Sequence, residues 1–243
     1  MGLLTTDWES KNPVYGLIIR FAEFYPVSDG YDTHVERLKD LVARGYSVVV
    51  FPEGTRSETG EILRFHKGAF SLAQALQVDI LPVYLHGAHD VMPKNDIVLR
   101  EGQLYVEIGE RMRVQQLSLM EPRALTSMFH KLYIQHYEEI RKQRETTEYV
   151  LPFVRSKYYY KGREVERACR HNLKKIKLQA AEIDAMNQER VDLDDTGYGE
   201  LAWTLALVHR DMQVHASLPD EEAYLIASHC SYIPNNLHFM QKS

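Results

Sequence analysis

The sequence predicts an α/β fold in which a mixed sheet is flanked by helices. Two short apolar runs, residues 47–51 and 80–85, have the composition of strands buried on both faces, as in a parallel sheet. Between them, residues 69–76 carry apolar side chains at helical spacing. Strand, helix and strand in this order are typical of an α/β sheet. Because 44% of the 243 residues are hydrophobic, the chain has enough apolar material for a sizeable core.

The first elements follow from periodicity and from glycine and proline. Residues 33–44 place their apolar side chains on one helical face, and Gly45 is a typical helix end. The apolar run at 47–51 predicts the first buried strand. Pro52 and Gly54 then predict a turn directly after it.

The later elements are predicted in the same way. Residues 97–109 suggest a hairpin, and 120–144 read as a long amphipathic helix. The stretch 146–161, with a tyrosine triplet and several charges, reads as a linker. A basic amphipathic helix is predicted over 162–182, and a smaller helix-and-strand rhythm follows over 191–240.

Composition limits the function classes. The net charge of −5 gives no overall argument for nucleic-acid binding. Cys169 and Cys230 form neither a disulfide framework nor a metal-ligand spacing, which favours a reduced, cytoplasmic compartment and predicts no metal site. No apolar run approaches the ~20 residues that span a bilayer, so any membrane contact is expected to be peripheral.

The basic region around the predicted helix at 162–182 allows several interpretations. Its cations are Lys157, Lys161, Arg163, Arg167, Arg170, Lys174, Lys175 and Lys177. Contact with anionic lipid headgroups is one interpretation. Nucleic acid is another, without further support, and a solvated face with acidic neighbours such as Glu164 and Glu166 is a third.

A candidate phosphate site follows the first predicted strand, where α/β sheets place their ligands. Here Gly54 permits backbone geometry that other residues resist, and Arg56 offers a planar fork suited to phosphate. Thr55 adds a hydroxyl, and Glu53 is expected to orient a nearby arginine or lysine. Lys67 adds charge where the next helix begins, and a helix N-terminus itself favours an anion.

The run from Phe51 to Ser57, F-P-E-G-T-R-S, resembles the acceptor-binding motif of the lysophospholipid acyltransferase family. The resemblance covers about residues 5–145 and continues beyond the motif. Residues 65–70 resemble the family's F-x-x-G-A-F segment, and 80–83 its I-x-P-V strand. Residues 13–16 resemble the stretch between the family's first two motifs.

The resemblance implies a function and a fold. Family members transfer a fatty acyl group from an acyl-CoA or acyl-carrier-protein thioester to a lysophosphatidate-type hydroxyl, without a cofactor, at the cytoplasmic face of the cell membrane. It implies an acyltransferase-type mixed sheet in which the acceptor phosphate is held by Glu53, Gly54, Thr55, Arg56 and Lys67.

The chain departs from the family at the catalytic base. Members carry an H-x-x-x-x-D motif upstream of F-P-E-G-T-R, and no such spacing precedes Phe51 here. The single match, His215 to Asp220, lies after the motif and is interpreted as coincidence, and no catalytic role is assigned to His66 or His86. The chain by itself is therefore expected to be inactive. The alternative is a non-catalytic module that binds a lysophospholipid or phosphate within a larger protein.

The last segment resembles the start of a class I S-adenosylmethionine-dependent methyltransferase. Gly197 and Gly199 resemble its glycine-rich loop, but Asp195 stands at the first glycine position and the acid after the second strand is absent. The expected cofactor loop is therefore degenerate, within a truncated Rossmann-like segment. A methyltransferase remnant is the weakest of the three functional hypotheses.

The predicted organisation has three parts. Residues 1–147 form an acyltransferase domain, 148–190 a linker with the basic helix, and 191–243 the partial methyltransferase-like segment. The order resembles the junction in a bacterial polypeptide that fuses a transporter, an acyltransferase and a methyltransferase.

Overall fold

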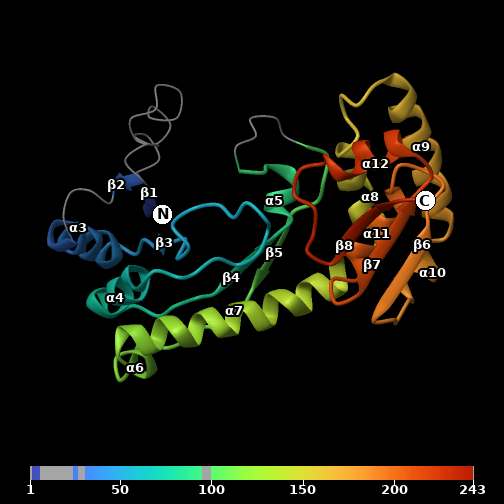
Figure 1. The fold of residues 1–243 in the computed structure, drawn as a ribbon. Helices are drawn as coiled ribbons and strands as arrows, with labels where there is room; N and C mark the ends of the chain where they lie inside the picture. Colours follow the sequence, from blue (N-terminus) through green and yellow to red (C-terminus); the bar gives the residue numbers. More distant parts are fainter. Residues whose placement is uncertain (1, 6–23, 27–30, 95–99, 243) are drawn as a thin grey trace. The chain divides into compact units, whose positions relative to one another are not determined.

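A computed structural model describes residues 2–5, 24–26, 31–94 and 100–242 (Figure 1). Its helices are α3 (Tyr31–Ala43), α4 (Lys67–Leu76), α5 (Ala88–Val91), α6 (Val114–Leu117), α7 (Pro122–Arg144), α8 (Thr147–Ser156), α9 (Arg163–Leu178), α10 (Ala180–Asp184), α11 (Glu200–Val208) and α12 (Glu221–Ser228). Its strands are β1 (Gly2–Thr5), β2 (Phe24–Pro26), β3 (Val48–Val49), β4 (Val83–His86), β5 (Tyr105–Ile108), β6 (Arg190–Asp194), β7 (Gln213–Leu218) and β8 (Leu237–Gln241). This mixture confirms the predicted α/β class.

The strands form separate small sheets. One has the order β2-β1-β3 and another the order β6-β7-β8, and both are parallel. Strands β4 and β5 form a two-stranded sheet, and an antiparallel bridge joins Ile80 to Met112 nearby. The helices α11 and α12 are the crossovers that parallel neighbours in the third sheet require.

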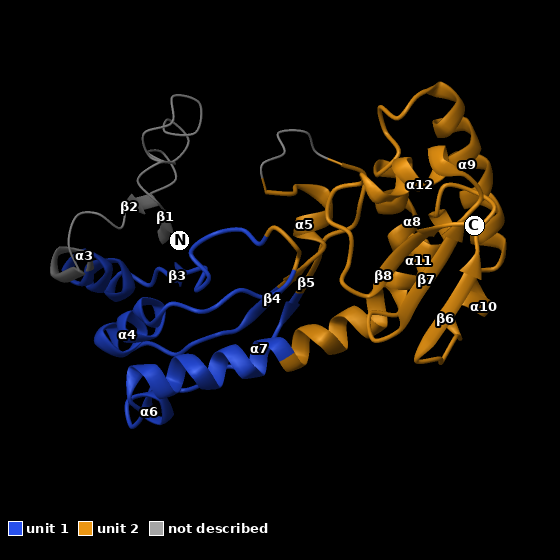
Figure 2. Ribbon diagram, in the orientation of Figure 1, with its two compact units in different colours: residues 1–57, 61–84, 107–134 blue, residues 58–60, 85–106, 135–243 orange. Residues whose placement is uncertain are grey.

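The chain divides into two compact units, drawn in different colours in Figure 2. Unit 1 comprises residues 1–57, 61–84 and 107–134. Unit 2 comprises residues 58–60, 85–106 and 135–243.

The described part of unit 1 has two apolar clusters, and each follows from helical periodicity. In the first, Val35, Leu38 and Leu41 of α3 pack with Leu72 and Leu76 of α4. Helix α3 ends at the predicted place because Gly45 adopts a φ of +86°, which favours glycine.

The second cluster of unit 1 joins α4 to α7. Its members are Phe65, Phe70, Leu117, Leu125 and Phe129, all buried. Gln74 of α4 donates from Nε2 to the carbonyls of Leu117 and Met120, at 2.7 and 2.8 Å. These bonds hold the start of α7 against α4.

Unit 2 has the largest core. Helix α11 packs against strands β7 and β8 of the parallel sheet, α8 and α9 pack against α11, and Trp203, Leu205, Val214 and Ala216 are fully buried there. The predicted apolar stripe of α9, formed by Val165, Cys169, Leu173 and Ile176, is confirmed as buried.

Several predicted elements differ from the structure. The buried strand expected at 47–51 is reduced to β3, whose residues are half-buried, and Phe51 is 61% exposed. The strand expected at 80–85 is β4, shifted to residues 83–86, and its burial alternates along the strand. Both predictions of burial on two faces were wrong, since the two residues of β3 are half-buried and β4 has one exposed and one buried face.

Two further predictions concern the chain's connections. Of the hairpin expected over 97–109, the structure describes only β5, which pairs with β4; residues 97–99 lie outside the described residues, as do residues 13–16. The linker expected over 146–161 was wrong. Its residues form α8, and Val150, Val154 and Tyr158 are buried in the core of unit 2.

Only some of the cations in the basic region lie on the surface. Lys157 is 6% exposed, donates from Nζ to the Ser231 carbonyl at 2.6 Å, and lies 4.3 Å from the Phe153 ring centroid. Burial lowers the pKa of Lys157 to about 8. On α9, Arg170 pairs with Glu166 at 3.6 Å, in the manner of a solvated helix face. Lipid contact by the exposed cations stays a prediction, and no described helix combines the length and apolar character needed to cross a bilayer.

Candidate functional site

The F-P-E-G-T-R-S loop follows β3 and folds back on itself. The Gly54 N–H donates to the Phe51 carbonyl at 3.1 Å, and Gly54 has a φ of +66°. A Cβ at Gly54 would lie 3.3 Å from Cδ2 of His66. The turn therefore needs glycine for its backbone and also places residue 54 close to the start of α4.

Glu53 anchors this loop to the backbone. Its Oε2 accepts from the Leu63 N–H at 2.8 Å, and the His66 N–H donates to the Pro52 carbonyl at 2.7 Å. Burial raises the pKa of the Glu53 carboxyl above its ordinary value, while the bond from Leu63 and the nearby His130 oppose that shift. Glu53 was expected to orient a cation, but its described bond is to the main chain.

The loop leaves Thr55 and Arg56 exposed. Lys67, the other cation of the predicted set, is also exposed but lies in a separate setting. It lines a pocket of about 530 Å³ whose other lining residues are Arg64, Phe65, His66, Arg123, Thr126, Ser127 and His130. Glu53, Gly54, Thr55 and Arg56 are not in this lining, so the pocket contains only Lys67 of the predicted residues.

The contribution of α7 was missed by sequence reasoning. Arg123, Thr126, Ser127 and His130 lie in the first turns of this helix, far along the chain from the motif. They were predicted only as part of a long amphipathic helix. No spacing in the sequence links them to Lys67, because the contact between α4 and α7 is tertiary.

His86, which carries no assigned role, belongs to a buried ionic network. Its Nε2 lies 3.1 Å from Oε1 of Glu145, and both residues are buried. Arg141 Nε contacts the same oxygen at 3.3 Å, and Arg210 Nε contacts Oε2 at 2.6 Å. Burial alone raises the pKa of Glu145, but His86 and the two arginines outweigh it and lower the pKa to about 2.

The loop after β6, with Gly197 and Gly199, is filled by the protein's own side chains. Asp195 Oδ1 accepts from the Gly197 N–H at 2.8 Å. Glu200 is 1% exposed and accepts from the Tyr198 N–H at 2.8 Å through Oε2. A Cβ on Gly197 would lie 2.4 Å from that oxygen, and a Cβ on Gly199 would lie 2.7 Å from the Phe239 ring. Both glycines are therefore required by packing within the chain.

Burial raises the pKa of both loop carboxyls. For Asp195, the N–H groups of Gly197, Ala202 and Gly199 oppose the shift. For Glu200, its own N–H, that of Tyr198 and the Asn172 amide oppose it. Two buried acids inside the loop disfavour a further anionic group there.

The remaining candidates have structural roles. Asp220 caps α12, since its Oδ1 accepts from the Ala223 N–H at 2.8 Å. His215 lies on β7 with its ring 4.7 Å from that of His238 on β8. Among the described residues, no group of His, Cys, Asp and Glu side chains is arranged to hold a metal ion.

Comparison with known proteins bears on the first site. Residues 6–86 match the family described as Acyltransferase. The matched segment is about one third of the chain. It contains the F-P-E-G-T-R-S loop and Lys67, whereas the α7 residues of the pocket lie beyond it.

Relatives of stated activity agree. The chain is 30% identical over 112 residues to a 1-acyl-sn-glycerol-3-phosphate acyltransferase of Cocos nucifera, covering 44% of this chain and 36% of that protein. It is 31% identical over 101 residues to a 1-acyl-sn-glycerol-3-phosphate acyltransferase of Borreliella burgdorferi, covering 42% of this chain and 40% of that protein. It is 35% identical over 80 residues to the alpha form of Homo sapiens, covering 33% of this chain and 28% of that protein. The matched part thus spans less than half of each relative.

A solved structure is also similar. It is the 1-acyl-sn-glycerophosphate acyltransferase PlsC of Thermotoga maritima, with a TM-score of 0.49 and 25% sequence identity, covering 57% of this chain and 56% of that one. These matches give no support to the predicted methyltransferase-like segment at 191–243.

Proposed function

We propose that the chain supplies the acceptor-binding part of a 1-acyl-sn-glycerol-3-phosphate acyltransferase. In this reaction the acceptor hydroxyl attacks the carbonyl carbon of an acyl-CoA or acyl-carrier-protein thioester, an ester forms, and the thiol leaves. The proposal takes residues 1–147 as the part that serves this chemistry at a cytoplasmic membrane face. It rests on the relatives named above and on the F-P-E-G-T-R-S loop.

One observation carries the proposal. Glu53 ties the loop to Leu63 while Thr55 and Arg56 remain exposed at its tip. A held loop with an exposed guanidinium suits a phosphate monoester, because little motion has to be frozen on binding. In the proposal, Gly54 shapes the turn and Thr55 and Arg56 contact the acceptor phosphate, whereas Lys67 belongs to the separate pocket.

The test is calorimetric titration of the full chain with glycerol 3-phosphate, a soluble phosphate monoester. Removing a charge-assisted bond typically weakens binding by roughly tenfold or more, so we expect that loss in Arg56→Ala. Arg44→Ala is the matched control, since Arg44 is an exposed arginine of the same unit that pairs with Asp40 at 3.3 Å. Equal affinity in the two variants contradicts the assigned role of Arg56.

A second candidate is binding without catalysis. It differs from the enzyme in needing no general base, a group that typically contributes about 10²–10⁴-fold to the rate. Incubating the chain with acyl-CoA and lysophosphatidate, with release of free thiol as the readout, separates the two. Turnover that is lost in Arg56→Ala supports the enzyme, whereas retained binding without turnover supports the module.

A further inference from the structure

The pocket lined by Lys67 is built from the beginnings of two helices. Helix α4 begins at Lys67, and His66, at its N-cap, makes no side-chain capping bond. Helix α7 begins at Pro122 and contributes Arg123, Thr126 and Ser127 from its first two turns. Each helix N-terminus carries a partial positive charge of about half an elementary charge, so the two reinforce one another at this place.

Three cations of the pocket have no acidic partner among the described residues. Arg64, Lys67 and Arg123 are exposed, and within the described residues none of them has a hydrogen bond or ion pair. No carboxylate is among the described lining residues, and the first turns of α4 and α7 contain no acidic residue. Elsewhere in unit 1, by contrast, Arg44 and Arg113 pair with aspartates. The described lining of the pocket therefore concentrates positive charge.

The pocket is also held in shape before any ligand arrives. His130 Nε2 lies 3.1 Å from the Leu63 carbonyl, and its ring lies 5.0 Å from that of Phe65. Phe65 is 4% exposed and belongs to the cluster that joins α4 to α7. The segment 63–67 and the start of α7 are thus fixed to one another, so that binding costs little reorganisation.

The available donors suit a phosphate rather than a carboxylate. Thr126 uses its hydroxyl on the Pro122 carbonyl at 2.6 Å, whereas the Ser127 hydroxyl has no described partner. Two guanidinium groups, an ammonium and a hydroxyl can together satisfy several oxygens of a dianion. At about 530 Å³, the pocket can hold the phosphate with part of the molecule that carries it.

We infer that this pocket is a second anion site, which binds a phosphate monoester through Arg64, Lys67, Arg123 and Ser127. This site is separate from the one proposed at Arg56. It rests on the proposed function only for the identity of the two molecules that could supply its phosphate. Those sources are the acyl donor, whose coenzyme A portion carries a 3′-phosphate, and the glycerol phosphate acceptor.

The experiment uses the full chain and three probes. Inorganic phosphate, adenosine 3′,5′-bisphosphate and glycerol 3-phosphate are titrated while amide chemical shifts are followed by NMR. We expect saturable shifts at Lys67, Gly68, Thr126 and Ser127 with at least one probe. Arg123→Ala is expected to weaken that binding by roughly tenfold or more.

Lys131→Ala is the matched control, since Lys131 is an exposed cation of α7 outside the pocket lining. Selective weakening of the bisphosphate identifies the donor as the source, and selective weakening of glycerol 3-phosphate identifies the acceptor. Equal weakening in Arg123→Ala and Lys131→Ala, or no saturable shift with any probe, overturns the inference. Arg56 lies outside the pocket. If binding is lost only in Arg56→Ala, this inference is overturned and the proposed function is still supported.

Discussion

Two glycine-containing loops occupy equivalent places after strands of two parallel sheets. Exposed side chains characterise one loop, and buried carboxylates characterise the other. One follows β3 and leads towards α4, and the other follows β6 and leads into α11. At the first, Thr55 and Arg56 are exposed and α4 begins without a side-chain cap. At the second, Asp195 and Glu200 are buried within the loop and accept from its backbone N–H groups.

The difference shows that a strand–glycine–helix pattern is not by itself a ligand site. Such a loop presents N–H groups to an anion only if nothing in the chain already occupies them. In unit 2 the chain supplies its own carboxylates, and its buried charges, such as Glu145, are likewise paired internally. In unit 1 the pocket cations Arg64, Lys67 and Arg123 have no partner among the described residues, so a ligand from outside is favoured there.

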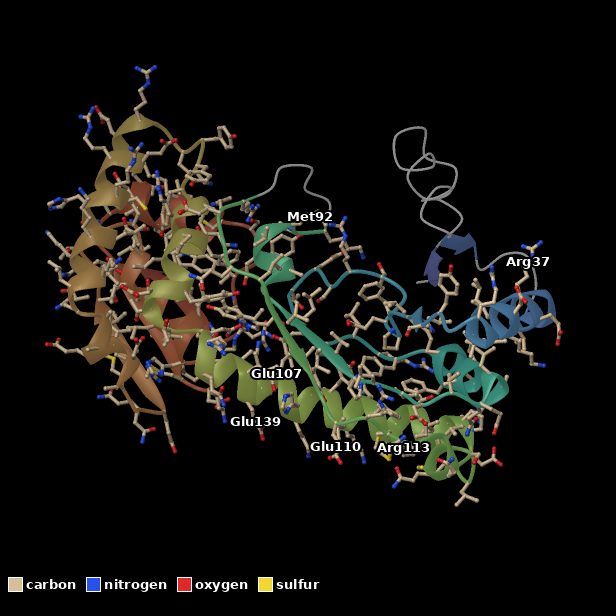
Figure 3. The ribbon with its side chains drawn as sticks, turned by 180° about the vertical axis from the view of Figure 1, so that it is seen from behind. Arg37, Met92, Glu107, Glu110, Arg113 and Glu139 are labelled. Carbon is tan, nitrogen blue, oxygen red and sulfur yellow. The ribbon has the colours of Figure 1, made fainter. Side chains whose placement is uncertain are left out.

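The largest expected change in the free energy of unfolding comes from breaking the buried ion pairs of unit 2. Glu145→Ala leaves His86, Arg141 and Arg210 without their shared carboxylate, and breaking a buried pair typically costs about 3–5 kcal/mol. Urea unfolding should show this loss in the free energy of unfolding. Glu139→Ala is the control on α7, the helix that carries Arg141, because the Glu139 side chain is 70% exposed and projects from α7 (Figure 3). We expect its cost to be at most about 0.5 kcal/mol.

The same network has a defined pH dependence. The folded-state pKa of Glu145 is about 2, below its ordinary value of 4.5, so its stabilisation is present above pH 4.5 and is lost as the pH falls towards 2. The stability difference between the wild type and Glu145→Gln should shrink over that window. A difference that stays constant across it would show that Glu145 is not ionised in the folded protein.

Replacing a glycine in each of the two loops is expected to cause an intermediate loss of stability. Gly199→Ala combines a φ of +90° with a Cβ 2.7 Å from the Phe239 ring, and we expect a loss of about 2–4 kcal/mol. Gly54→Ala has a φ of +66° but meets only the exposed His66 ring at 3.3 Å, so about 1–2 kcal/mol is expected. Thermal unfolding of both variants measures the order.

The control for these substitutions is Gly68→Ala. Gly68 lies in α4 with nothing within 4 Å of a new Cβ, so alanine should be neutral or slightly stabilising. If Phe239 causes the larger loss, Gly199→Ala should cost less in a Phe239→Ala background than in the wild type. Equal losses at Gly54 and Gly199 would remove the packing difference between the loops.

The last prediction is that one ligand leaves the unfolding temperature unchanged. Because Asp195 and Glu200 occupy the loop of unit 2, S-adenosylmethionine at up to millimolar concentration should leave the unfolding temperature unchanged. Glycerol 3-phosphate is the comparison ligand and should raise it. Micromolar binding of S-adenosylmethionine would break the comparison and restore the methyltransferase hypothesis.

The sequence by itself determined the elements whose pattern is local. Helices α3, α4, α7 and α9 lie where periodicity predicts them, and the glycines end or turn the chain where a positive φ is needed. The F-P-E-G-T-R-S string also identified the family segment, because those residues are contiguous.

Tertiary structure decided what each charged group contacts. Lys157 was predicted in a basic region and residues 146–161 as a linker, but packing against Trp203 and its neighbours buries Lys157, and residues 147–156 form a core helix. Glu53 was expected to orient a cation and instead binds a backbone N–H. Arg123 meets Lys67 in one pocket only because α7 packs on α4. Periodicity reports which face of an element is apolar, whereas the partner of a charge depends on which distant element packs beside it.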